Sequence, residues 1–222
     1  MTQSMRIVIP GLPHHVVQRG ARGVDIFHSD ADRTLYLQLL ARFGEQYGLS
    51  FWAWGLMTNH VHLVAVPANK DSLARGIGSA HRCYARCVNA QTGARGHLFQ
   101  GRFYSYPSQT DGHLLAVVRY AELNPVLAGL PCRFDQYPWT SAYYRLSGRQ
   151  DPIVTANPLS ELVADWRSFL EDRIQIAEDR PAIERHLSSG HPFGSDEWVS
   201  ELGRMSGHRV TPKQRGRPRR GR

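Results

Sequence analysis

Two histidines separated by one residue carry the clearest chemical signal in this sequence. His60 and His62 lie in the apolar run 56–64, which is rich in residue types typical of β-strands. Side chains two positions apart on a strand point to the same face. The two imidazoles would therefore lie side by side and could bind a divalent metal through neutral ring nitrogens. Two buried histidines that only form hydrogen bonds within a sheet are the alternative interpretation.

A second candidate pair follows later in the chain. Tyr120 and Asn124 are four positions apart in a segment that predicts a helix, so they share one helical face. Beside the imidazoles, Asn124 would supply an oxygen to a magnesium-type ion and Tyr120 would be the nucleophile of a phosphoryl transfer. On spacing alone, a tyrosine that only packs is the favoured alternative. Tyr104 and Tyr106 are rival nucleophiles, but neither has an amide four residues on in a helix.

The elements that must position these residues follow the order β-α-β-β-α-β. Strands are predicted at 14–19, 50–57, 60–66 and 97–108, and helices at 30–47, 71–92 and 111–124. Asp111 is expected to cap the third helix, and Pro125 to end it. This order predicts an α+β fold with a ferredoxin-like split βαβ antiparallel sheet, whose central strands are the first and third. A short helix at 139–146 is expected to pack on this body, and further helices at 159–177, 181–187 and 195–205 are expected to form a C-terminal helical extension.

The positive charge of the chain is concentrated at its end. The net charge is +8, and residues 213–222 hold six of the 27 basic side chains and none of the 19 acidic ones. The rest of the chain therefore carries only +2. Such a basic tail is typical of an arm that binds nucleic acid.

Composition excludes several other classes of protein. No apolar run approaches the ~20 residues needed to span a bilayer, and the first ten residues do not resemble a signal peptide. We therefore expect a cytoplasmic protein with no membrane partner. The three cysteines (Cys83, Cys87 and Cys132) indicate no disulfide framework, and we interpret Cys83 and Cys87 as packing residues rather than metal ligands.

Three segments together resemble the REP-associated tyrosine transposases, members of the single-tyrosine HUH superfamily. They are Met57-Thr58-Asn59-His60-Val61-His62-Leu63, His97-Leu98-Phe99-Gln100-Gly101-Arg102-Phe103 and the stretch 119–130, which begins Arg119-Tyr120-Ala121-Glu122-Leu123-Asn124. The resemblance covers about residues 5–146. Two departures are Thr58, where proline is frequent, and Leu127, where arginine is frequent. We therefore predict a transposase domain at 1–150, followed by a helical C-terminal extension at 151–212 and a basic tail at 213–222.

The resemblance also implies a mechanism. His60 and His62 would hold Mg²⁺ or Mn²⁺, with Asn124 as the third ligand. Tyr120 would attack a phosphodiester of single-stranded DNA, leaving a 5′-phosphotyrosine and a free 3′-hydroxyl. The substrates would be hairpins of repetitive extragenic palindromes, in a bacterial, nucleoid-associated protein. We expect a monomer, with a dimer as the alternative.

Several residues are candidates for DNA contacts because cations bind phosphate and aromatic faces stack on unpaired bases. The candidates are Arg19, Arg22, Arg82, Arg86, Arg102, Phe103, Tyr104, Arg119, Lys213, Arg215, Arg217 and Arg219.

The sequence therefore predicts a metal-dependent single-strand DNA endonuclease and strand transferase. A non-catalytic DNA-binding repressor, or a domesticated remnant that recognises palindromic repeats, is the alternative. A metal-dependent hydrolase of small molecules is a third class, for which the sequence offers no further metal ligands at a recognisable spacing.

Overall fold

The computed structural model describes residues 7–109, 112–130, 133–155, 158–189 and 192–206. Its centre is a four-stranded antiparallel sheet with strand order β2-β3-β1-β4. The strands are β1 (His14–Arg19), β2 (Leu49–Leu56), β3 (His60–Pro67) and β4 (Tyr104–Pro107). The first and third strands are central, as the sequence predicts, and the α+β fold class is confirmed.

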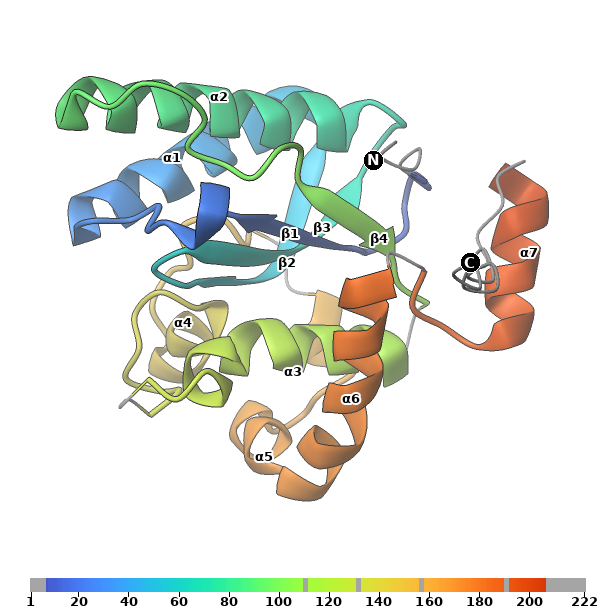
Figure 1. Ribbon diagram of the computed structural model, residues 1–222. Helices are drawn as coiled ribbons and strands as arrows, with labels where there is room; N and C mark the ends of the chain where they lie inside the picture. The colour runs from blue at the N-terminus through green and yellow to red at the C-terminus, as the bar shows by residue number, and fades with distance from the viewer. Residues whose placement is uncertain (1–6, 110–111, 131–132, 156–157, 190–191, 207–222) are drawn as a thin grey trace, which may run out of the picture.

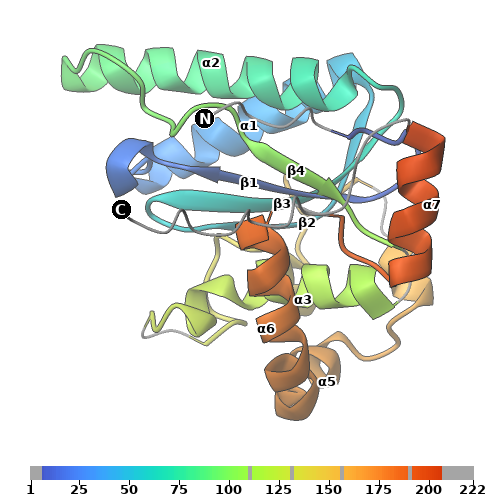
Figure 2. The same cartoon turned by 45° about the vertical axis from the view of Figure 1, so that its right-hand side comes forward.

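Helices cover both faces of this sheet (Figure 1). In chain order they are a short 3-10 helix (Ala21–Gly23), α1 (Asp30–Tyr47), α2 (Ser72–Thr92), α3 (Gly112–Leu127), α4 (Ser141–Ser147), a second 3-10 helix (Pro158–Glu161), α5 (Trp166–Glu171), α6 (Arg173–Ser189) and α7 (Asp196–Ser206). The pair α1 and α2 lies on one face. The helices α3 to α6 lie on the other, and α7 stands beside the edge formed by β4 (Figure 2).

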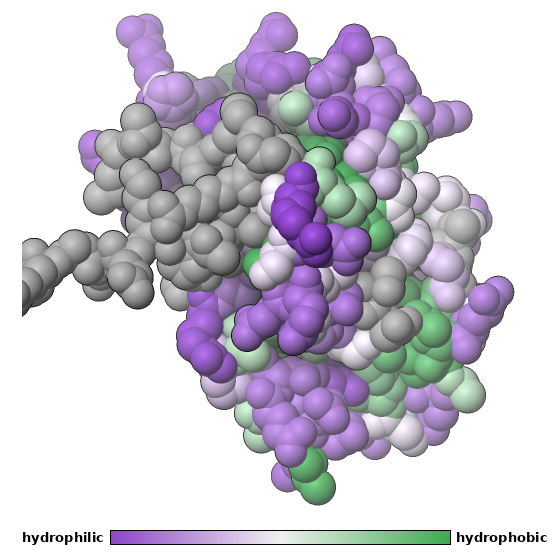
Figure 3. Space-filling view, turned by 90° about the vertical axis from the view of Figure 1, so that its right-hand side faces the viewer, coloured by the Kyte–Doolittle hydropathy of each residue, from purple (hydrophilic) through white to green (hydrophobic). Residues whose placement is uncertain are grey.

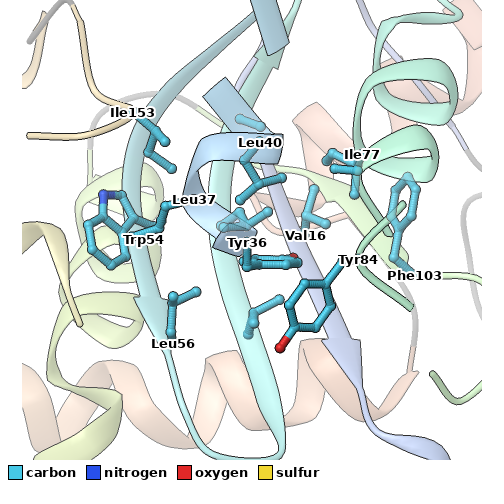
Figure 4. Packing of buried hydrophobic residues seen from close by; sticks show 14 of the residues in the cluster. Val16, Tyr36, Leu37, Leu40, Trp54, Leu56, Ile77, Tyr84, Phe103 and Ile153 are labelled. Carbon is cyan, nitrogen blue, oxygen red and sulfur yellow. The ribbon is translucent and has the colours of Figure 1, made fainter. Parts of the chain in front are cut away.

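The main hydrophobic core fills the space between the sheet and the α1–α2 pair (Figure 4). Val16, Trp54 and Leu63 from the strands are fully buried there against Tyr36 and Ile77 from the helices. Apolar side chains that alternate along each strand supply this face. The opposite face of the same strands is consequently free to carry polar residues.

Helix α3 approaches that opposite face unusually closely. Gly55 of β2 lies against the backbone of α3, and a Cβ atom at this position would overlap the carbonyl oxygen of Ala121. The helix can lie this near the strand only because Gly55 has no side chain.

Pro125 does not end α3, contrary to the sequence-based expectation. The helix continues to Leu127, and a turn follows in which the amide of Ala128 donates to the Asn124 carbonyl at 2.9 Å. A proline lacks the N–H that would bond to the carbonyl four residues before it. Here that carbonyl belongs to Ala121 and faces Gly55, and the buried Pro125 lies only one turn from the helix end. Asp111, the expected cap, lies outside the described residues.

Two other predicted boundaries differ from the structure. The fourth strand begins at Tyr104 rather than at residue 97, because Gly101 adopts a left-handed backbone with φ 66° and interrupts the extended chain. The predicted helix 159–177 is broken, since Asp165 caps a new helix by accepting from the amides of Arg167 and Ser168.

Helix α6 also departs from the predicted pattern, because it runs through Pro181 without a break. The carbonyl left without an intrahelical donor is that of Ala177. Ala177 is exposed, and water can satisfy its carbonyl.

The C-terminal segment packs into the same body as the rest of the chain. Asp151 accepts hydrogen bonds at 3.1 Å from the indole of Trp54, and Ile153 is buried in the main core. Leu159 is fully buried under the sheet with residues of α3. Packing is therefore continuous across residue 150, the boundary predicted from the sequence.

Both edge strands are partly covered by other segments of the chain. Along β4, Phe193 accepts from the amide of Gln109 at 2.8 Å and donates to the carbonyl of Pro107 at 3.1 Å. Along β2, the amide of Leu56 donates to the carbonyl of Trp139 at 2.8 Å. Segments near residues 139 and 193 thus act as short additional strands.

The surface seen from the side of α7 is mostly hydrophilic, with hydrophobic residues in smaller areas (Figure 3). Among the described residues, no helix is long and apolar enough to cross a membrane. The basic tail at 213–222 and Cys132 lie outside the described residues.

The close approach of α3 to β2 can be tested with Gly55→Ala. The added methyl group would force the helix away from the sheet, and we expect a loss of about 1–3 kcal/mol in the free energy of unfolding, measured by urea denaturation. Gly112→Ala is the matched control, since a Cβ there meets no atom within 4 Å. Equal stability of the two variants would contradict the proposed role of Gly55.

Candidate active site

The two histidines of the central strand face the α3 side of the sheet. His60 and His62 alternate with Val61 and Leu63, which are fully buried on the opposite face. The two imidazole rings lie with their centroids 5.1 Å apart and nearly perpendicular. The sequence-based expectation of two imidazoles on one face agrees with this arrangement.

Asn124 connects this strand to helix α3. Its side-chain oxygen lies 3.1 Å from Nε2 of His60. The second ring nitrogen of His60, Nδ1, lies 2.7 Å from the side-chain oxygen of Asn59, which fixes the orientation of the ring. Burial lowers the pKa of His60 to about 4, an effect that the charge of Arg19 reinforces. The imidazole is therefore neutral at neutral pH, and its ring is presented toward the helix.

Tyr120 completes the cluster from one turn earlier on α3. Its ring meets the ring of His62 edge to face, with centroids 5.4 Å apart. A side-chain hydrogen bond joins Tyr120 to Asn124. Burial and the nearby carboxylate of Glu184 raise the pKa of the phenol, while Arg180 and Arg19 act in the opposite direction. The helical spacing of four therefore does bring the phenol and the amide together beside the imidazoles.

His62 is the most deeply placed member of the cluster. It is fully buried, and its Nδ1 lies 2.9 Å from Nε2 of His15 on β1. Its other nitrogen, Nε2, is buried and has no hydrogen-bond partner within the described part of the chain. Burial, together with the neighbouring His15, holds the pKa of His62 well below its ordinary value. A neutral imidazole with one nitrogen anchored and the other unpaired is the usual state of a metal ligand.

These groups fit a divalent cation. Two neutral imidazoles and an amide oxygen form a donor set of mixed nitrogen and oxygen type. The 3.1 Å between His60 Nε2 and Asn124 Oδ1 is close to the ~3 Å between adjacent ligands of an octahedral ion bound at about 2.1 Å. Among the described residues, no group of three His, Cys, Asp or Glu side chains forms an alternative site.

A buried ion pair fixes α3 from behind the site. Glu122 is fully buried and accepts from Nε of Arg145 at 3.0 Å and from the hydroxyl of Ser141 at 2.6 Å. Its other oxygen accepts from the indole of Trp166 at 2.7 Å. Arg145 also donates to the carbonyl of Trp52 on β2. The Glu122 carboxylate thus connects α3, the helix that carries Tyr120, directly to α4 and α5. Through Arg145 it also connects α3 to the sheet.

The C-terminal extension contacts α3 next to the tyrosine. Arg119 forms a 2.7 Å ion pair with Asp179 of α6 and donates to the carbonyl of Phe169 at 3.0 Å. The sequence suggested Arg119 as a DNA contact. The structure instead buries this side chain, at 9% exposure, and uses its charge inside the protein.

Phe103 also differs from the sequence-based prediction. Its ring is buried in the main core, edge to face with His81, and is therefore not available to stack on a base. Its neighbour Tyr104 is 46% exposed. Tyr104 lies opposite Val17, which in turn pairs with His62, so its side chain belongs to the face that carries the site.

The arginines predicted to contact DNA that the structure describes lie, apart from Arg119, in two regions. Arg19 pairs with His60 in the sheet register, and its carbonyl accepts from the amide of Gln100 at 2.8 Å. Arg19, Arg22 and Arg102 are exposed. Arg82 and Arg86 are also exposed, but they lie on α2, across the sheet from the site. Lys213, Arg215, Arg217 and Arg219 lie outside the described residues.

Sequence reasoning missed two histidines beside the site, one on β1 and one on α6. His15 contacts His62, and His186 of α6 lies against Tyr106 with ring centroids 4.8 Å apart. His15 follows His14 at the start of a predicted strand, but the pairing register that places it beside His62 is not visible in the sequence. The position of His186 depends on how α6 packs.

Comparison with protein families identifies the chain. Residues 9–124 match the family model described as IS200-like transposase, and this match covers more than half of the 222 residues. The chain belongs to the IS200-like transposase family. A search of curated proteins finds no match.

Two solved structures are similar to the chain. A REP-associated tyrosine transposase bound to a REP hairpin aligns with a TM-score of 0.54 at 15% identity, over 71% of this chain and 93% of that one. A Deinococcus radiodurans protein classified provisionally as a transposase aligns with a TM-score of 0.38 at 18% identity, over 55% of this chain and 97% of that one. The first likeness shows that the chain shares the fold of a tyrosine transposase.

The anchoring role of Glu122 predicts a large effect of its removal. Glu122→Ala would remove the only carboxylate described as bonded to the buried Arg145, and we expect a loss of about 3–5 kcal/mol in the free energy of unfolding. Glu171→Ala serves as the control because its ion pair with Arg167 is exposed, at 3.8 Å, and should change stability by less than about 0.5 kcal/mol. Similar losses in both variants, measured by chemical denaturation, would rule out the anchoring role.

Proposed function

We propose that this protein is a metal-dependent single-strand DNA endonuclease and strand transferase that acts through Tyr120. The observation that carries this proposal is the meeting of α3 with β3, where a phenol and an amide adjoin two neutral imidazoles. A protein that only binds DNA has no need for this cluster. Membership of the IS200-like transposase family supports a DNA-processing reaction.

His60, His62 and Asn124 would hold the cation, Mg²⁺ or Mn²⁺. A cation in this position polarises the scissile phosphate and offsets the negative charge that develops in the transition state. The two imidazoles contribute because they stay neutral, with their lone pairs available at physiological pH. A side-chain hydrogen bond also joins Asn124 to Tyr120, so Asn124 would connect the metal ligands to the nucleophile.

Tyr120 would attack the phosphorus atom of the scissile phosphodiester. The phenolic oxygen forms a new bond to phosphorus, the bond to the 3′ oxygen breaks, and the strand is left with a free 3′-hydroxyl. The phenol gives up its proton, and the leaving oxygen takes one up. Because burial raises the pKa of Tyr120, the positive charges of Arg19 and Arg180, which lower it, favour the attacking form.

We propose single-stranded or hairpin DNA as the substrate, with hairpins of repetitive extragenic palindromes as the class to test first. A solved transposase of similar fold is bound to such a hairpin. In this chain, the exposed Arg19 and Tyr104 lie on the same face as the catalytic cluster. A cation for phosphate and an aromatic face for an unpaired base suit a single strand beside the site.

The catalytic role can be tested with Tyr120→Phe. This variant should bind a labelled hairpin as the wild type does, yet form no covalent protein–DNA adduct in Mg²⁺ or Mn²⁺, seen as a denaturant-resistant band. Tyr104→Phe is the control and should form the adduct at the wild-type level. Wild-type adduct levels in Tyr120→Phe would remove Tyr120 from the nucleophilic role.

The same assay tests the metal site and separates an enzyme from a DNA-binding protein. His60→Ala, or addition of a chelator to the wild type, should abolish the adduct without abolishing hairpin binding. A wild-type protein that binds hairpins but never forms an adduct would instead be a non-catalytic binder.

Tyr104 is expected to contribute to binding of the unpaired strand. Tyr104→Ala should weaken binding of a single-stranded oligonucleotide by about 1–3 kcal/mol, the usual loss for one stacked base, as measured by fluorescence anisotropy. Tyr47→Ala on α1 provides the control, because α1 covers the opposite face of the sheet. Equal affinity in both variants would exclude Tyr104 from the binding surface.

A further inference from the structure

A third histidine lies directly behind the candidate metal ligands. His15 of β1 is fully buried, and its ring stacks on that of His62 with centroids 5.2 Å apart. The contact is a hydrogen bond of 2.9 Å between His15 Nε2 and His62 Nδ1. Neither the fold nor hydrophobic packing requires two imidazoles in contact at this position, since an apolar pair would fill the same space.

We propose that His15 is a positioning residue that fixes the tautomer of His62 for metal binding, an inference that rests on the metal site proposed above. A neutral imidazole carries one ring hydrogen. If His62 donates that hydrogen from Nδ1 to His15, the lone pair of His62 is confined to Nε2. That is the buried nitrogen that has no partner within the described residues.

His15 can accept this hydrogen bond because no other contact dictates its own tautomer. Its second nitrogen, Nδ1, is buried and has no hydrogen-bond partner in the described part of the chain. His15 can therefore keep its hydrogen on Nδ1 and present a lone pair at Nε2. Contacts of this kind between a ligating histidine and a second group commonly raise metal affinity 10–100-fold.

The sheet register makes this placement specific to His15. His15 lies opposite Val64 and His62 lies opposite Val17, so both imidazoles project from the same face of adjacent strands. His14, one residue earlier, is equally buried but points to the other face, where it contacts the backbone of Leu12 and Ile9. His14 is therefore a matched control for burial and position.

Direct metal binding is the decisive measurement, because it does not depend on catalysis. Mn²⁺ affinity, measured by electron paramagnetic resonance of the free ion in the full-length protein, should fall about 10–100-fold in His15→Leu. His15→Gln should stay within a few-fold of the wild type, since its side-chain oxygen reaches the place of Nε2. His15→Asn is too short to reach His62 and should behave like His15→Leu.

The outcomes separate this inference from the proposed function. If His60→Ala removes Mn²⁺ binding but His15→Leu and His15→Asn do not weaken it, the positioning role of His15 is wrong and the metal site stands. If His60→Ala leaves Mn²⁺ binding unchanged, the metal site itself is wrong. His14→Leu should retain wild-type Mn²⁺ affinity, and a loss equal to that of His15→Leu would mean that any disturbance of β1 produces the effect.

A spectroscopic measurement covers the case in which His15→Leu does not fold. Long-range ¹H–¹⁵N correlation in the wild-type protein reports which ring nitrogen of His62 carries hydrogen. The proposal requires hydrogen on Nδ1, and hydrogen on Nε2 of His62 in the presence of Mg²⁺ would overturn it.

Discussion

The position of the tyrosine helix depends on a charge buried beneath it. Glu122 lies two residues from Tyr120 and two from Asn124, and its carboxylate has no contact with water. Burying a charge is unfavourable unless partners compensate it, and here Arg145, Ser141 and Trp166 do so. Those partners come from two other helices, since Ser141 and Arg145 belong to α4 and Trp166 belongs to α5. The helix can therefore occupy its place only when the segments around it have also folded, which explains why the C-terminal extension shares its core with the sheet.

Burial has two opposite effects on the chemistry of the cluster. It keeps His60 and His62 uncharged, as metal ligands must be. The same burial raises the pKa of the Tyr120 phenol, which works against its ionisation. Arg19 from β1 and Arg180 from α6 act in the opposite direction and lower the pKa, whereas Glu184, also from α6, raises it further. Helix α6 thus influences the nucleophile although it lies outside the ferredoxin-like order of elements.

The sequence predicts the order of the elements and the proximity of the four candidate site residues, because both depend on local spacing. Alternation along a strand places His60 and His62 on one face, and a spacing of four places Tyr120 beside Asn124. Residues whose roles depend on register or tertiary packing could not be predicted. His15 acquires its contact from the β1–β3 register, while Arg119 and Phe103 are withdrawn into the interior by α6 and by the main core. Pro125 and Pro181 show the same limit. The local rule that proline ends a helix predicted breaks at both positions, but α3 continues past Pro125 and α6 continues through Pro181.

The short segments along the edges of the sheet have a consequence for self-association. Exposed edge strands invite pairing with another molecule, since their amides and carbonyls are unsatisfied. The backbone of Phe193 forms hydrogen bonds with such groups at the end of β4, and the carbonyl of Trp139 accepts a hydrogen bond from β2. A second copy of the chain would have to displace these residues before the two sheets could join into one. The protein is therefore partly protected against edge-to-edge growth of the sheet by segments that are distant from the edge strands in sequence.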